Sequence, residues 1–153
     1  MTRTFHTQNA DETRALAAHL GALLHAGDTL CLVGDLGAGK TTFTQGLALG
    51  LGLPAEEPVN SPTFTLVAEH PGGRVPLVHL DVYRLSGPSD LYDLAFDDYL
   101  SGDSIVVIEW ADKITDVLPS DRLDITLTPD APDTRQIVMA AWGTRAEELL
   151  ATL

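Results

Sequence analysis

Positive charge is scarce in this chain. Of its 153 residues only nine are lysine or arginine, against 22 aspartates and glutamates, and the formal net charge is −13. A protein that holds a nucleic-acid backbone unaided needs a basic surface for the phosphates. The composition argues against such binding, so in any nucleic-acid pathway we expect a partner to hold the nucleic acid. Most of the acidic residues are expected only to keep the surface hydrated.

Long apolar runs and cysteines are also lacking. No run reaches the roughly 20 apolar residues that span a bilayer, and the opening Met-Thr-Arg-Thr-Phe-His lacks the apolar stretch of a signal peptide. We therefore expect a cytoplasmic protein with no membrane segment. The single cysteine, Cys31, is expected to be a buried structural thiol. With 44% hydrophobic residues, the chain is expected to form one domain over residues 1–153.

The most informative run lies at residues 34–41, which read Gly-Asp-Leu-Gly-Ala-Gly-Lys-Thr. It has the pattern GxxxxGK[ST] of the phosphate-binding loop of nucleoside triphosphatases. The apolar run at 29–33 predicts the strand that enters such a loop, and the apolar spacing after it predicts the helix that leaves it. Glycines let backbone N–H groups turn toward an anion at the positive end of that helix. We therefore predict that Lys40 reaches the β- and γ-phosphates and that Thr41 places its hydroxyl on Mg²⁺.

Alternating strand and helix patterns predict an α/β fold. Strands are predicted at 29–33, 64–68, 75–80, 104–108, 123–127 and 136–140. Helices are predicted from the Asn9 cap to Gly27, at 41–51, at 88–100 and, briefly, after Thr144. We expect a phosphate-loop NTPase-like architecture, with a mainly parallel central sheet, antiparallel additions and helices on both faces. In such a sheet ligands gather at the carboxyl ends of the strands.

Two acidic residues, Asp81 and Glu109, each lie at the end of an apolar run that predicts a strand. A nucleoside triphosphatase needs a carboxylate at a second strand end, where it holds Mg²⁺ or its water. Glu109 fits the metal role better, because the strand before it is the more continuously apolar. Asp81 has two interpretations, either the same metal role or orientation of the attacking water. For each residue taken alone, the alternative is a solvated acid at a strand end.

A switch-like segment is predicted at Ser61-Pro62-Thr63, about twenty residues beyond the phosphate loop. Pro62 stiffens this segment, and the hydroxyls of Ser61 and Thr63 are suited to contact a γ-phosphate and to let go of it after hydrolysis. The alternative is a plain turn before a strand.

Several other polar or aromatic residues lie near the predicted strand ends. His79 is expected to be a structural residue, and Trp110 either covers a nucleotide or packs. Arg84 either stabilises transition-state charge or pairs with an acid. Arg135 is a further candidate nucleotide contact.

Two motifs that are absent from the sequence narrow the choice of nucleotide and of reaction. The sequence has no Asn-Lys-x-Asp segment to read guanine, so ATP is favoured over GTP. It also has no run of arginines like the lid of small-molecule kinases. Three functions stay open at this point: a partner-dependent ATPase, a small-molecule kinase that uses the same loop, and a nucleotide-gated binding module with negligible turnover.

Four motifs together resemble the TsaE family. They are the loop at 34–42, Ser-Pro-Thr-Phe-Thr at 61–65, His-Leu-Asp-Val-Tyr-Arg at 79–84 and Ile-Glu-Trp at 108–110. The loop alone is shared by many ATPases, but the combination is specific, and its order and spacing extend over essentially the whole chain. One departure is Ala111, where the family often has proline.

The resemblance implies a function and a set of roles. Family members are small ATPases required for N6-threonylcarbamoyladenosine in tRNAs that read codons beginning with A. They use ATP and Mg²⁺, bind the transferase subunit TsaD and its paralogous partner TsaB, and meet tRNA only indirectly. Roles implied for this sequence are nucleotide binding by Gly37, Ala38, Gly39, Lys40, Thr41, Thr42, Asp81 and Arg135; metal binding by Thr41 and Glu109; catalysis by Asp81 and Lys40; and switching by Ser61 and Thr63.

Overall fold

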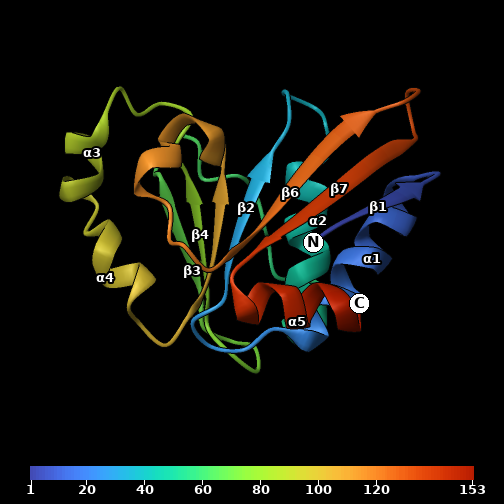
Figure 1. The fold of residues 1–153 in the computed structure, drawn as a ribbon, viewed down its shortest axis with the longest axis horizontal. Coiled ribbons are helices and arrows are strands. Elements are labelled where there is room, and N and C mark those ends of the chain that lie inside the picture. Colours follow the sequence, from blue (N-terminus) through green and yellow to red (C-terminus); the bar gives the residue numbers. More distant parts are fainter.

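The computed structural model describes residues 1–153, except for the side chain of Pro88. Its described residues form one seven-stranded sheet, in the order β1-β7-β6-β2-β5-β4-β3 (Figure 1). The strands are β1 (Thr2–Thr7), β2 (Thr29–Val33), β3 (Val67–His70), β4 (Leu77–Asp81), β5 (Ile105–Glu109), β6 (Arg122–Pro129) and β7 (Arg135–Trp142). The helices are α1 (Ala10–Leu23), α2 (Lys40–Gly50), α3 (Pro88–Asp93), α4 (Phe96–Leu100) and α5 (Thr144–Thr152), with a 3-10 segment, η1 (Ala111–Val117).

The centre of the sheet is parallel. β6, β2, β5 and β4 run in one direction, whereas β3 at one edge and β7 with β1 at the other pair antiparallel to their neighbours. The predicted α/β fold with a parallel centre and antiparallel additions is therefore confirmed. Because β2 lies between β6 and β5, the loop that follows β2 opens at the middle of the carboxyl edge.

A hydrophobic core lies on each face of the sheet, as strand alternation requires. On β2, Leu30 and Leu32 point into the core formed with α1, α2 and α5, while Cys31 points into the core formed with α3, α4 and η1. Helices therefore cover both faces, as predicted (Figure 1). Cys31 is the expected buried thiol, and burial, assisted by Asp124, raises its pKa to about 12.

Two local predictions are wrong, and one strand was not predicted. The helix expected at 88–100 is two helices, because Ala95 takes a left-handed conformation with φ of 54°. Leu91 and Phe96, five positions apart, would face different directions on one continuous helix, and the break lets both reach the same core. The strand expected at 64–68 begins only at Val67. Strand β1 was not predicted, because its six residues are mostly exposed and lack an apolar alternation.

Helices α1 and α2 pack closely through glycines. A Cβ atom added to Gly46 would lie 2.4 Å from the carbonyl oxygen of Arg14 and 2.6 Å from the Cβ of Ala17. A backbone oxygen cannot rotate out of the way, so the two helices would have to separate.

We expect Gly46→Ala to lower the stability of the protein. The better helix propensity of alanine should raise the free energy of unfolding by about 1 kcal/mol, but overpacking against backbone should lower it by about 3 kcal/mol. The net loss of about 2 kcal/mol should lower Tm by roughly 5 °C in calorimetry. Gly87→Ala is the control, because nothing lies within 4 Å of a Cβ added there and its φ of 178° suits any residue. Equal Tm values for the two variants would contradict the packing argument.

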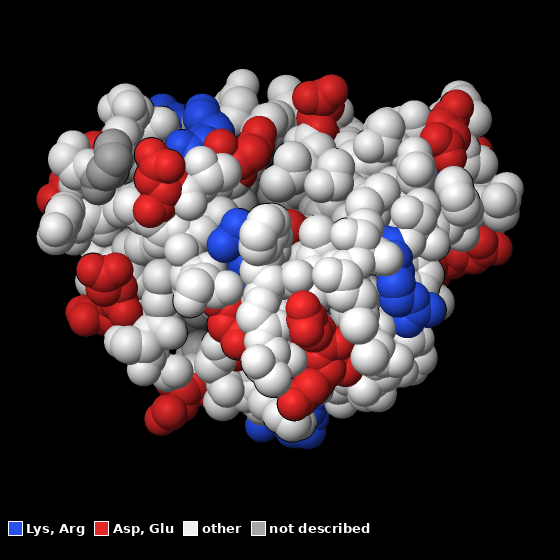
Figure 2. Space-filling model, in the orientation of Figure 1, with Lys and Arg blue, Asp and Glu red and all other residues white. Residues whose placement is uncertain are grey.

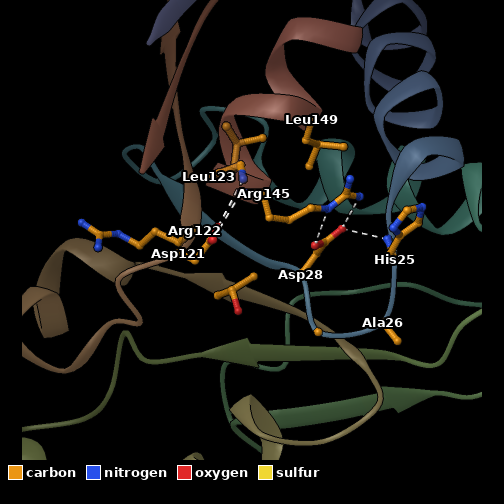
Figure 3. A pocket seen from close by; sticks show the side chains of 11 residues that line it. His25, Ala26, Asp28, Asp121, Arg122, Leu123, Arg145 and Leu149 are labelled. Carbon is orange, nitrogen blue, oxygen red and sulfur yellow. Dashed lines mark hydrogen bonds and ion pairs between the residues drawn. The ribbon is translucent and has the colours of Figure 1, made fainter. Parts of the chain in front are cut away.

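A hollow of about 310 Å³ opens at the opposite, amino edge of the sheet (Figure 3). There the guanidinium of Arg145 donates to both carboxylate oxygens of Asp28, at 3.0 and 2.9 Å. The carboxylate of Asp121 accepts from the backbone N–H of Ala146 in the first turn of α5, at 3.2 Å. These bonds tie the C-terminal helix to the strands, so the hollow is explained by packing.

Candidate functional site

The run at 34–39 forms a tight turn between β2 and α2. Gly37 and Gly39 have φ of 79° and 106°, in the left-handed region that favours glycine. A Cβ added to Gly37 would meet nothing within 4 Å, so the backbone here is open to close approach. Lys40, Thr41 and Thr42 then form the first turn of α2. This is the strand–loop–helix context that an anion-binding loop requires.

The side chain of Lys40 folds back over the turn. Its ammonium donates to the carbonyl oxygens of Gly34 and Asp35, and it lies 4.1 Å from the centre of the Trp110 ring. Burial lowers the pKa of Lys40, against the opposing effect of the nearby carboxylates, first among them Glu109. The lysine is thus already held at the loop, in contact with groups from two strand ends.

Arg135, at the start of β7, also reaches the loop. Its Nε donates to the carbonyl oxygen of Ala38 at 2.8 Å, and one terminal nitrogen donates to that of Gly37 at 3.2 Å. In this arrangement the guanidinium holds two carbonyl groups of the turn. The structure therefore brings Arg135 to the loop, and its predicted contact with a nucleotide stays a prediction.

The two predicted carboxylates lie side by side at the carboxyl edge. Asp81 and Glu109 are register partners at the ends of β4 and β5, and each is 2% exposed. A buried carboxylate is unfavourable unless it is hydrogen-bonded or paired. Both are bonded here, and the switch-like segment supplies part of that bonding.

Ser61 joins the phosphate loop to Glu109. Its hydroxyl donates to Glu109 Oε2 at 2.8 Å and shares a second hydrogen bond with the Thr41 hydroxyl. Since the one proton of Ser61 goes to Glu109, the Thr41 hydroxyl must donate to Ser61. The two predicted metal ligands are therefore linked through a single side chain.

Thr63 makes the corresponding contact with the other acid. Its hydroxyl donates to Asp81 Oδ2 at 3.2 Å, while Asp81 Oδ1 accepts from the backbone N–H of Tyr83 at 2.9 Å. The switch-like segment therefore touches both strand-end carboxylates, Glu109 through Ser61 and Asp81 through Thr63.

These residues fit a nucleotide with Mg²⁺ better than a metal ion alone. Among the described side chains, no group of three or more histidines, cysteines or acids is arranged to hold a metal. Mg²⁺ in nucleotide sites commonly uses one or two protein oxygens and takes the rest from phosphates and water. Thr41 and Glu109, linked through Ser61 beside the loop, match that donor set.

Comparison with known proteins identifies the family. The model of the family described as threonylcarbamoyl adenosine biosynthesis protein TsaE matches residues 7–137. The tRNA threonylcarbamoyladenosine biosynthesis protein TsaE of Bacillus subtilis is 46% identical over 145 residues, which cover 95% of this chain and 89% of that protein. The TsaE protein of Streptomyces coelicolor is 44% identical over 139 residues, covering 86% and 92%.

The chain belongs to the TsaE family. The crystal structure of Bacillus subtilis YdiB superimposes with a TM-score of 0.86 at 39% identity, covering 99% of this chain and 93% of that one. The similarity therefore extends over the fold as well as the sequence. With membership of the family comes the role that the family name states, in tRNA threonylcarbamoyladenosine biosynthesis. Within the described part of this TsaE-family chain, none of the helices has the length and apolarity needed to cross a membrane.

Sequence reasoning missed several contacts of this TsaE-family site. Trp110 has φ of 62°, a left-handed conformation that is costly for a bulky residue. The resulting turn after β5 places its ring against Lys40 and 4.7 Å from the ring of Tyr83. His79, expected to be structural, donates from Nε2 to Glu109 Oε2 at 2.5 Å. The available signal was strand alternation, which puts His79 and Asp81 on one face of β4.

Proposed function

We propose that this TsaE-family protein is a partner-dependent ATPase of tRNA modification. Its chain, acting as one domain in the cytoplasm, would bind ATP with Mg²⁺ and act on the TsaD–TsaB heterodimer to support repeated formation of N6-threonylcarbamoyladenosine. The transfer itself would belong to the heterodimer. The proposal extends the family role in biosynthesis to a specific reaction and to specific partners.

One observation carries the proposal: the hydrogen bonds of Ser61 to both Thr41 and Glu109. Coordination of Mg²⁺ by Thr41 and Glu109 would involve the two side chains that Ser61 links. Metal binding, phosphate binding and the position of the switch-like segment are then coupled, because one cannot change without affecting the others. A protein built in this way converts its nucleotide state into a change of shape that a partner senses.

The chain's own residues divide the remaining work. Lys40 binds the β- and γ-phosphates, and the backbone from Gly37 to Thr42 surrounds them. Asp81 orients the attacking water, and Thr63 holds the Asp81 carboxylate in place. Bound Mg²⁺ would neutralise negative charge that develops on the phosphates.

Surface charge supports a helper role in the tRNA pathway. The net charge is −13. On the face of the molecule drawn in Figure 2, acidic side chains are scattered with few basic ones between them. Such a surface repels the tRNA backbone. The heterodimer would therefore hold the tRNA, and the ATPase would meet it only indirectly.

Hydrolysis is expected to be slow for the isolated protein and faster with the heterodimer. We expect an increase of at least about tenfold, since 1.4 kcal/mol of transition-state stabilisation already gives that factor. Phosphate release is measured for the protein alone, for the heterodimer alone and for the mixture, with tRNA modification followed over several turnovers. Tight tRNA binding by the isolated protein at physiological salt, or identical rates in the mixture and in the sum of its parts, would contradict the proposal. Phosphorylation of a small acceptor would instead favour the kinase alternative.

A further inference from the structure

His79 is a buried histidine in contact with the proposed metal ligand Glu109. It lies in the middle of β4, its side chain is completely buried, and its Nε2 lies 2.5 Å from Glu109 Oε2. Among the described side chains, its Nδ1 is one of two buried polar atoms with no hydrogen-bond partner. A buried polar atom without a partner is unfavourable, so the position of this imidazole calls for an explanation beyond packing.

The strand register explains how the two residues meet. His79 pairs with Val107 across the parallel β4–β5 ladder, and Glu109 lies two residues farther along β5, on the same face. The imidazole therefore reaches Glu109 along the same face of the sheet, from a position two residues nearer the amino edge. Ser61 approaches from the loop side and donates to the same oxygen, Oε2. Two donors on one oxygen fix the rotation of the carboxylate about its last torsion.

The tautomer follows from the same contact. A carboxylate only accepts hydrogen bonds, so Nε2 must carry the proton that it shares with Glu109. In the neutral tautomer with Nε2 protonated, Nδ1 carries a lone pair, which is less costly to bury than an N–H group without an acceptor. His79 is thus a one-sided donor, directed at Glu109.

We propose that His79 is a positioning residue that holds the Glu109 carboxylate in the orientation needed for Mg²⁺ at the phosphate loop. This inference rests on the proposed role of Glu109 as a metal ligand. His79 itself touches neither metal nor nucleotide; it acts through the carboxylate. Hydrogen bonds to metal ligands of this kind commonly change metal affinity by about tenfold to a hundredfold when removed.

A second histidine in the chain provides a matched control. His70, on β3, is also buried, its Nδ1 lies 2.9 Å from Glu57 Oε2, and its Nε2 is the other buried polar atom without a partner. The two histidine–glutamate pairs therefore share their chemistry, but Glu57 has no assigned role at the loop. The Glu57 side chain is 29% exposed and that of Glu109 only 2%. Loss of His79 should therefore cost more stability than loss of His70, while only the loss of His79 should affect the metal.

The test compares His79→Leu, His79→Gln and His70→Leu with the unaltered protein. Calorimetry measures the affinity for a non-hydrolysable ATP analogue in EDTA and at a series of Mg²⁺ concentrations. We expect His79→Leu to raise the Mg²⁺ concentration for half-maximal effect by about tenfold to a hundredfold, with the affinity in EDTA unchanged. His79→Gln, whose amide can donate to Glu109, should stay near the unaltered protein, as should His70→Leu.

The outcomes separate a positioning role of His79 from a role in packing alone, and separate both from a failure of the proposed function. A His79→Leu variant with normal Mg²⁺ dependence would overturn the inference while leaving the proposed function intact. An unaltered protein whose nucleotide binding ignores Mg²⁺ would instead overturn the proposed function. If the leucine variant does not fold, His79→Asn replaces it, because its shorter amide does not reach Glu109. Equal Mg²⁺ dependence of the Asn and Gln variants would then count against positioning.

Discussion

Lys40→Ala is expected to weaken Mg-ATP binding by about a hundredfold. The Lys40 ammonium lies at the loop, bonded to the carbonyl oxygens of Gly34 and Asp35. We expect it to exchange these neutral acceptors for phosphate oxygens when nucleotide binds. A hydrogen bond to a charged group contributes up to about 3 kcal/mol, and a loss of about 2.7 kcal/mol corresponds to a hundredfold change in Kd. Titration calorimetry with a non-hydrolysable analogue measures the loss directly.

Lys113→Ala is the matched control for this prediction. Lys113 is the other lysine, and it also donates to a backbone carbonyl, that of Tyr83, and lies 5.0 Å from the centre of an aromatic ring. It belongs to η1 rather than to the loop, so its removal should leave the affinity nearly unchanged. Unchanged affinity in Lys40→Ala, or an equal loss in both variants, would refute the role given to Lys40. Thermal unfolding of each variant shows whether the loop change has damaged the fold.

The sequence was sufficient to predict the loop and the two strand-end acids, because these depend on local patterns. A glycine-rich turn between an apolar strand and a helix is recognisable from a few adjacent residues. Asp81 and Glu109 each end an apolar run, and a parallel pairing of β4 and β5 brings such ends together. The central architecture follows from the same patterns.

Contacts that depend on the exact register could not be predicted. The bond from His79 to Glu109 requires that residue 79 lie opposite 107, a pairing that apolar patterns alone do not specify. The contact of Trp110 with Lys40 requires a left-handed turn that a tryptophan rarely adopts. β1 was missed for a different reason: it is an edge strand stabilised by pairing with β7, and its own sequence has little apolar content.

Asp81→Asn is expected to leave nucleotide binding nearly intact and to remove most of the hydrolysis. Asparagine has almost the shape of aspartate, so its side-chain oxygen can still accept from Tyr83, and its amide can donate to the Thr63 hydroxyl. The fold and the loop should persist, but the negative charge that would orient the attacking water is lost. Misplacing a reacting group by about 1 Å can slow a reaction by about 10²-fold, so we expect a loss of that order. The measurement is phosphate release in the presence of the heterodimer, beside calorimetry of analogue binding.

Asp112→Asn separates this role from a general effect of charge. Asp112 is an exposed acid on η1 whose charge acts on Lys40, as that of Asp81 does, but more weakly. If Asp81 serves only to balance the charge of Lys40, both variants should alter nucleotide affinity and neither should selectively stop hydrolysis. If Asp81 orients the water, only Asp81→Asn should lose turnover while it keeps its affinity. A normal hydrolysis rate in Asp81→Asn would remove this residue from the reaction and leave Glu109 as the one strand-end acid with a proposed part in it.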